Sequence, residues 1–144
     1  MKKIKYIIFI IVAIIIDQIS KHIIISNNVN ITLIPNLLNF TYVQNFGAAF
    51  GTMQGANYIL AIISLFICLV VIGYIIYQHK KGIVSSFGLF MILSGGIDNL
   101  IDRLFRGFVI DFIDTPFIAT FNIADSLIVI GCFWLIIEAF IKKE

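Results

Sequence analysis

The chain has 144 residues, of which 60% are hydrophobic and 12% are charged, and its mean hydropathy is +1.06. A soluble domain carries about 25% charged residues, so this composition excludes a disordered tail, a secreted scaffold and a typical cytosolic enzyme. The formal net charge of +2 is too small for a nucleic-acid-binding surface, and we expect no nucleic-acid partner. We expect one integral membrane domain over residues 1–144.

Four apolar runs predict four transmembrane helices, at about residues 4–25, 58–77, 83–101 and 126–141. Each has roughly the 17–25 residues that a spanning helix needs, although the fourth is the shortest. Lipid admits only helices or closed barrels, and runs of this length favour helices. The first run begins like a secretory signal peptide, but at its far end it carries Asp17 and Lys21 instead of a small-residue cleavage site.

The basic residues predict the orientation of these helices. Three clusters precede the first run, join the second to the third, and follow the fourth; they are Lys2, Lys3 and Lys5, then Lys80 and Lys81, then Lys142 and Lys143. With four spans, all three clusters fall on one side of the membrane. By the positive-inside rule that side is the cytoplasm, so both termini are expected there and the two long connections face outward.

The two outer connections, at about residues 26–57 and 102–125, contain short β-branched and aromatic stretches. Residues 31–34 and 40–43 in the first connection and 107–113 in the second are typical of strands. We expect extended segments of the two connections to pair with each other outside the membrane.

On the predicted topology, all six aspartates lie in or near the outer half of the membrane. They are Asp17, Asp98, Asp102, Asp111, Asp114 and Asp125. Ionisable groups in or beside a membrane cost several kcal/mol unless they are paired or hydrated, so they are functional candidates. Structural roles remain open for some of them. Asp17 could pair with Lys21 and Asp102 with Arg106 along a helix, and Asp125 could cap the fourth span. Asp111 is the hardest to explain structurally, because it stands in an apolar stretch.

Two carboxylates that meet can hydrolyse a peptide bond. One deprotonates a water molecule while the other, protonated, donates to the scissile carbonyl. We expect Asp125, near a helix N-terminus, to be the ionised base and Asp111, among apolar side chains, to be the neutral acid. His22 and His79 lie toward opposite faces, so we expect no metal site, and no cofactor is indicated.

A small ion- or drug-coupled transporter is the main alternative, because such a protein could also have four spans and one acid, Asp17, in the first. That alternative leaves Asp111, Asn122 and Asp125 unexplained. A membrane scaffold without chemistry is a third possibility, which clustered aspartates disfavour.

Five motifs in order resemble the bacterial lipoprotein signal peptidase (signal peptidase II) family. They are Asp17-Gln-x-x-Lys21, Asn45-x-Gly-Ala-Ala-Phe50, Gly95-Gly-x-x-Asn99-x-x-Asp102-Arg103, Val109-x-Asp111-Phe112 and Phe121-Asn-x-Ala-Asp125. Each motif alone is weak, but five in order on a four-span chain are specific. The resemblance implies an all-α membrane protein with four transmembrane helices, a small extracytoplasmic β-cradle and a short surface helix.

The resemblance also implies an aspartyl endopeptidase of the bacterial cytoplasmic membrane. Its partners would be membrane lipid and a diacylglyceryl-modified prolipoprotein, cut at the extracytoplasmic face just before the lipidated cysteine by a monomer. On this resemblance Asp111 and Asp125 are the catalytic pair. The positions expected to bind substrate or support the site are Asp17, Lys21, Asn45, Gly47, Asn99, Arg103 and Asn122.

One position departs from the family pattern. Asp98 stands where this family usually has glycine, which adds an acid near Asp102 that Lys21 or Arg103 could neutralise. The outer loop at residues 45–57 is a candidate gate over the site, although its composition only permits that role.

Overall fold

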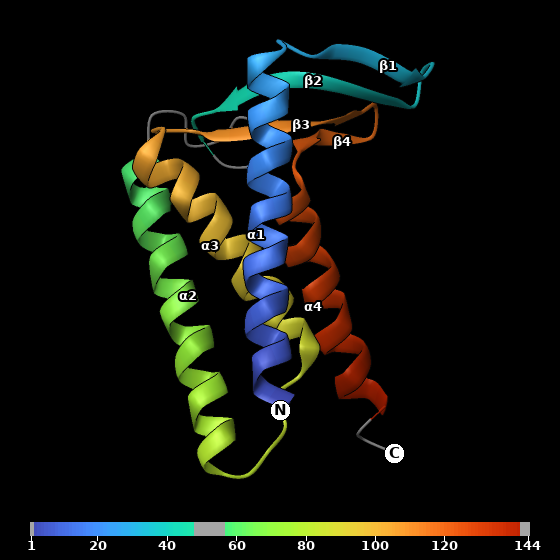
Figure 1. Ribbon diagram of the computed structural model, residues 1–144. Coiled ribbons are helices and arrows are strands. Elements are labelled where there is room, and N and C mark those ends of the chain that lie inside the picture. The colour runs from blue at the N-terminus through green and yellow to red at the C-terminus, as the bar shows by residue number, and fades with distance from the viewer. Residues whose placement is uncertain (1, 48–56, 142–144) are drawn as a thin grey trace.

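The computed structural model describes residues 2–47 and 57–141. In chain order its elements are α1 (Lys2–Ser26), β1 (Asn30–Ile34), β2 (Leu38–Asn45), α2 (Asn57–Lys80), α3 (Phe87–Phe105), β3 (Val109–Thr115), β4 (Ile118–Phe121) and α4 (Ile123–Ile141). The helices form a bundle, and the sheet lies across one end of it (Figure 1). α1 begins and α4 ends at the opposite end of the bundle, so the strands of both long connections gather on one side.

Within the described residues, three helices are long and apolar enough to cross a membrane, namely α1 from Ile4 onward, α2 and α4. Their large side chains face outward: Ile8, Phe66 and Phe133 are 54%, 66% and 61% exposed. An outward-facing apolar surface of this size suits a bundle whose solvent is lipid.

α3 is the central helix, and it packs against each of the other three. It carries three charged residues toward its C-terminal end, and two of them, Asp98 and Asp102, are buried. Since these charges lower its hydropathy, α3 is not among the apolar candidate spans. The third expected span is thus present as a helix whose polar face is turned into the protein.

All four helices differ in their bounds from the expected spans, and the third differs most. α3 begins at Phe87, four residues later than expected, because the Ser86 side chain accepts a hydrogen bond from the Gly88 N–H at 3.3 Å and caps the helix. It continues to Phe105, since its charged residues find partners inside the protein. α4 begins earlier than expected, at Ile123. α1 and α2 extend past their apolar runs, to Lys2–Ser26 and Asn57–Lys80.

Glycines bring the backbones of α3 and α4 into contact. A Cβ added to Gly88 would lie 2.6 Å from the Gly131 carbonyl oxygen, and one added to Gly131 would lie 2.7 Å from that of Gly88. At Gly95 a Cβ would collide with the carbonyl of Ala124, in the first turn of α4. Small residues permit this close approach, which fixes the start of α4 against α3.

The four strands form one antiparallel sheet in the order β1-β2-β3-β4. β2 pairs with β3, which confirms that the two outer connections associate. The register shifts by one residue between Phe40, opposite Ile113, and Val43, opposite Asp111. Such a bulge changes the direction in which nearby side chains point. The sequence did not predict β4, which has only four residues.

The short surface helix implied by the resemblance is not among the elements of residues 2–47 and 57–141. The candidate gating loop falls largely on residues 48–56, which lie outside the described residues.

Candidate active site

Asp111 lies in the buried first half of β3, and its side chain is held by two amides. Asn45 Nδ2 donates to Oδ2 at 2.8 Å and Asn122 Nδ2 donates to Oδ1 at 2.9 Å. The residue is 2% exposed. Burial, together with the nearby Asp125 carboxylate, raises the pKa of Asp111 to about 7, although the two amide hydrogen bonds oppose this rise.

Asp125 lies in the first turn of α4, and Asn122 is the residue that caps the helix. The Asp125 N–H donates to Asn122 Oδ1 at 2.8 Å, and Asp125 Oδ2 accepts from the Asn122 N–H at 3.3 Å. This reciprocal arrangement is a capping box. The alternative that Asp125 itself is the N-cap is therefore wrong, because α4 begins two residues earlier than Asp125.

Asn122 joins the two carboxylates. Besides Asp111, its Nδ2 donates to Asn99 Oδ1 at 3.1 Å and to the Ile110 carbonyl at 3.2 Å. Asn99 Nδ2 in turn donates to Asp125 Oδ1 at 2.7 Å. Asn122 is fully buried, so this network connects β3, α3 and α4 away from solvent.

Both carboxylates line one cavity of about 360 Å³ beneath the sheet. Arg103 and Asn45 supply further polar groups to its wall. The rest of the wall is largely apolar and comes from β3, β4 and α4: Val109, Ile118, Ala119, Phe121, Ile128 and Val129, together with Thr120. A cavity with a few convergent polar groups in an apolar wall is typical of a substrate site.

Arg103 brings a cation to this cavity. Its Nη1 is 3.4 Å from the Asn99 carbonyl, and its Nε is buried without a hydrogen-bond partner in the described part of the chain. The guanidinium therefore retains donor capacity toward a carbonyl or a developing negative charge.

Behind the cavity lies a buried cluster that we call the Lys21 cluster, made of Lys21, Asp17, Asp98 and Asp102. Lys21 Nζ is 2.7, 2.5 and 2.8 Å from carboxylate oxygens of the three aspartates, in that order. All four side chains are at most 1% exposed. The pairing of Asp17 with Lys21 is confirmed, and of the two cations considered for Asp98, Lys21 is the one that contacts it.

Gln18 and Arg106 complete the bonding of the Lys21 cluster. Gln18 Nε2 donates to Asp98 at 3.0 Å and to Asp102 at 2.9 Å. Arg106 pairs with Asp102, as its spacing predicted, and its Nη1 donates to Gln18 Oε1 at 2.9 Å. Each buried carboxylate thus has several donors, which burial of charge requires.

The Lys21 cluster also holds the backbone beside Asn122 and beside Asp111. Asp17 Oδ1 accepts from the Ile123 N–H at 3.0 Å, one residue after Asn122. Asp102 Oδ2 accepts from the Ile110 N–H at 3.2 Å, one residue before Asp111. Lys21 therefore positions both carboxylate-bearing segments through the aspartates that it neutralises.

Asn45 is oriented by the chain that follows it. The Gly47 N–H donates to Asn45 Oδ1 at 3.0 Å, so the amide presents Nδ2 to Asp111. Gly47 is buried beside the site, while Ala48, Ala49 and Phe50 of the same motif lie outside the described residues.

The structure gathers the predicted residues into two layers. Asn45, Asn99, Arg103, Asp111, Asn122 and Asp125 surround the cavity or its network, and Asp17 and Lys21 lie behind them. Sequence reasoning assigned no site role to Gln18 and Asp102. Both belong to the matched motifs, and the spacing of four residues had already placed Asp102 on the same helical face as Asp98.

Comparison with known proteins matches the chain to the same family as the five sequence motifs. The family model described as signal peptidase (SPase) II matches residues 9–141. A lipoprotein signal peptidase of Clostridioides difficile is 41% identical over 138 residues, covering 92% of each chain. One from Streptococcus thermophilus is 36% identical over 126 residues, covering 84% of this chain and 82% of the relative.

Two solved bacterial membrane enzymes have the same fold. One superimposes with a TM-score of 0.83 at 29% identity, covering 97% of this chain and 90% of the other. The second has a TM-score of 0.78 at 31% identity, covering 94% and 92%. The likeness extends over nearly the whole chain, including every element that carries a site residue.

Proposed function

Because this chain belongs to the signal peptidase II family and is a protease that cleaves signal peptides from prolipoproteins, we propose that Asp111 and Asp125 are its catalytic pair. The observation that carries this proposal is that both carboxylates line one cavity and are bridged by the amides of Asn122 and Asn99. A shared, largely buried site is what two cooperating carboxylates need.

The chemistry follows from the environments of the two carboxylates. Asp125 removes a proton from a water molecule, and the resulting hydroxide attacks the scissile carbonyl carbon. Asp111, protonated, donates to the carbonyl oxygen and stabilises its developing charge. When the tetrahedral intermediate collapses, Asp125 returns the proton to the leaving amine.

Different hydrogen bonding supports this division of roles. Asp125 accepts from Asn99 Nδ2 and from the Asn122 N–H at the start of α4, and both donors suit a carboxylate. Asp111 lies deeper in the apolar sheet, with its pKa raised to about 7, so it holds a proton at or below neutral pH.

The surroundings of the cavity suit a lipidated substrate. Its apolar wall matches a signal peptide and acyl chains, and the cut falls just before the diacylglyceryl cysteine. α3 crosses the membrane together with α1, α2 and α4, and the sheet and the cavity face the outside of the bacterial cytoplasmic membrane. Both chain ends lie on the cytoplasmic side, and a monomer suffices because one chain carries every site residue named here.

Cleavage of a diacylglyceryl-modified prolipoprotein by the purified protein tests the pair. Asp111→Asn and Asp125→Asn should each lower kcat by about 10²–10⁴-fold while leaving the protein folded. Asp114→Asn is the matched control, because Asp114 lies on the same strand but binds Asn39 and Thr120 instead. Cleavage that survives either of the first two changes removes that aspartate from the catalytic role.

The transporter alternative fits these contacts poorly. It requires an acid in α1 that can bind and release a cation, but Asp17 is buried against Lys21 and the Ile123 N–H. Family membership assigns the chain to the proteases instead.

A further inference from the structure

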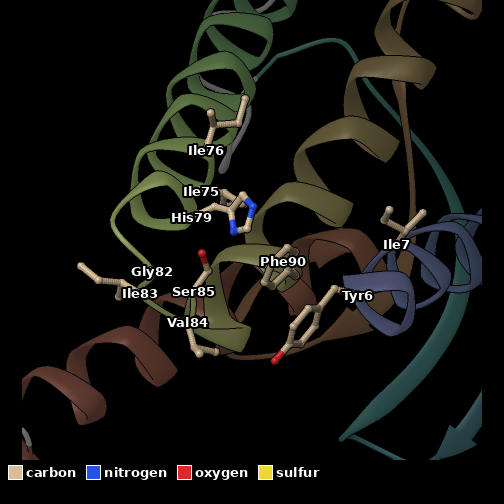
Figure 2. Close-up of a pocket in the computed structure, with 10 residues that line it drawn as sticks. All are labelled: Tyr6, Ile7, Ile75, Ile76, His79, Gly82, Ile83, Val84, Ser85 and Phe90. Carbon is tan, nitrogen blue, oxygen red and sulfur yellow. The ribbon is translucent and has the colours of Figure 1, made fainter. Parts of the chain in front are cut away.

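A second cavity, of about 440 Å³, lies at the end of the bundle opposite the sheet. It is formed by α1, α2, the loop between α2 and α3, and the beginning of α3 (Figure 2). Across residues 2–47 and 57–141, α1 and α2 both pack on α3 but scarcely touch each other, which leaves room between them. Its volume is within the range of about 300–1,000 Å³ found for small-molecule sites.

The lining of this cavity is apolar along its length and polar at one end. Ile7, Ile76 and Phe90 supply apolar surface, and Ile7 and Ile76 are 56% and 50% exposed, so the cavity opens sideways toward the lipid. His79, in the last turn of α2, and Ser85, near the end of the loop, contribute polar atoms (Figure 2). A ligand that matches this lining has an apolar chain and a polar head.

Three exposed lysines lie at the same end of the bundle as His79 and Ser85, and Lys81 Nζ lies 5.9 Å from the centre of the Tyr77 ring, which is not part of the lining. Lys80 and Lys81 follow His79 directly, and Lys5 precedes Tyr6, another lining residue. Lys5 Nζ lies 5.0 Å from the centre of the Tyr6 ring, which places that ammonium group at the cavity's edge. Among the described residues that line the cavity, none is acidic. The charge around the head therefore favours an anion.

We propose that this cavity binds an acyl chain of an anionic phospholipid, with the lipid phosphate held among Lys5, Lys80 and Lys81. The other apolar occupant available to this protein is the helix of the substrate's signal peptide. That helix carries basic residues at its N-terminal end, which three lysines would repel. An anionic lipid is attracted by the same lysines, so charge complementarity selects the lipid.

Fluorescence quenching tests this site independently of cleavage. The chain has a single tryptophan, Trp134, so Trp134→Phe with Phe90→Trp places one reporter in the cavity. Trp134→Phe with Phe66→Trp is the matched control, because Phe66 is 66% exposed on α2 and is not a lining residue. Each protein is reconstituted in mixed vesicles with phosphatidylglycerol or phosphatidylcholine carrying brominated chains. Retained prolipoprotein cleavage checks folding, and Ile76→Trp replaces Phe90→Trp if the latter misfolds.

From the quenching of the cavity reporter we expect an apparent affinity for brominated phosphatidylglycerol at least about fivefold higher than for brominated phosphatidylcholine. The control reporter should show no preference between the two lipids. Lys80→Gln with Lys81→Gln should remove that preference. Equal quenching by the two lipids at both reporters would overturn the proposal, since it would indicate unselected lipid. Protection of the cavity reporter by an added signal peptide, without a lipid preference, would overturn it in favour of the substrate helix.

Discussion

At the scale of single residues, the side chain of Asn122 combines two functions, a helix cap and a buried hydrogen-bond donor. Its side-chain oxygen caps α4, and its side-chain amide donates to Asp111, Asn99 and the Ile110 carbonyl. Aspartate or serine would cap the helix as well, but neither could supply this buried amide. Helix capping alone therefore does not require asparagine at this position, whereas the hydrogen bonds to Asp111, Asn99 and the Ile110 carbonyl do.

Replacing Asn122 with serine separates these two functions. Serine retains the cap, so we expect α4 to remain folded with a stability loss of about 1–3 kcal/mol from unsatisfied buried groups. Since Asp111 and Asp125 lose their common bridge, kcat should fall at least about tenfold. Steady-state cleavage and thermal unfolding measure the two effects. Asn39→Ser, which removes a hydrogen bond to Asp114, is the control, and an equal loss of kcat in both variants would contradict the role of Asn122.

The raised pKa of Asp111 predicts a pH dependence for cleavage. A carboxyl group with a pKa of about 7 is protonated below that pH and ionised above it. If Asp111 is the general acid, kcat should fall as the pH rises through about 7, because the proton donated to the carbonyl is lost. A pH–rate profile with saturating substrate measures this fall. A rate that stays constant well into the alkaline range would show that Asp111 does not act as the acid.

Lys21 and Asp98 should respond very differently to neutral substitutions. Lys21→Met leaves three buried carboxylates without their shared cation, so we expect a loss of about 3–5 kcal/mol or a failure to fold. Asp98→Gly removes the surplus acid that the family pattern usually lacks, and cleavage should be preserved or improved. Thermal unfolding and activity of both variants test this contrast. Complete loss of cleavage by folded Asp98→Gly would instead give Asp98 a role of its own.

At the scale of elements, the contact between α3 and α4 depends on glycine. Gly88 and Gly131 face each other so closely that neither position has room for a Cβ, whereas a Cβ at Gly73 in α2 meets nothing within 4 Å. The same contact carries Asn99 on α3 to Asp125 on α4. The close packing of α3 against α4 thus sets the distance between Asn99 and Asp125.

An alanine at Gly131 should push α3 and α4 apart. We expect a stability loss of about 1–3 kcal/mol, as for other overpacked interiors, together with reduced kcat. Gly73→Ala is the matched control and should be neutral or stabilising by about 0.5–1 kcal/mol, because a glycine within a helix carries an entropic cost. Thermal unfolding in detergent compares the two variants. Equal tolerance of both would mean that the helices can separate without loss.

At the scale of the whole molecule, the active site and the lysine-rich ends lie at opposite ends of the bundle. The sheet covers the cavity that Asp111 and Asp125 line, while Lys80 and Lys81 lie where α2 turns toward α3. A substrate whose apolar segment crosses the membrane therefore meets the two carboxylates at one surface only. This arrangement makes the orientation in the membrane decisive for function.

Labelling in whole cells tests that orientation. In a protein with Cys68 and Cys132 replaced by alanine, Thr32→Cys in β1 should react with a membrane-impermeant maleimide added outside the cells. Val84→Cys, in the loop at the other end, is the matched position and should react only after the membrane is opened. Labelling of Val84→Cys in intact cells would reverse the orientation that the lysines predict.

Membrane character, four helices and the pairing of the outer connections could all be predicted from the amino-acid sequence, as could the aspartates that we propose as the catalytic pair. These properties depend on runs of neighbouring residues: apolar stretches long enough to cross lipid, strand-like stretches between them, and acids concentrated near one end. The ion pairs Asp17–Lys21 and Asp102–Arg106 were also within reach, because residues four apart on a helix are neighbours.

The contacts between groups that lie far apart in the sequence could be identified only in the folded chain. Asp17 bonds the backbone of a residue 106 positions away, and Gln18 bonds Asp98 from 80 positions away. Asn122, and not Asp125, caps α4, and Asp98 forms an ion pair with Lys21, because packing on α3 brings these groups together. Local sequence patterns hold no information on contacts between such distant residues. These contacts form because buried polar groups need hydrogen-bond partners where water is excluded.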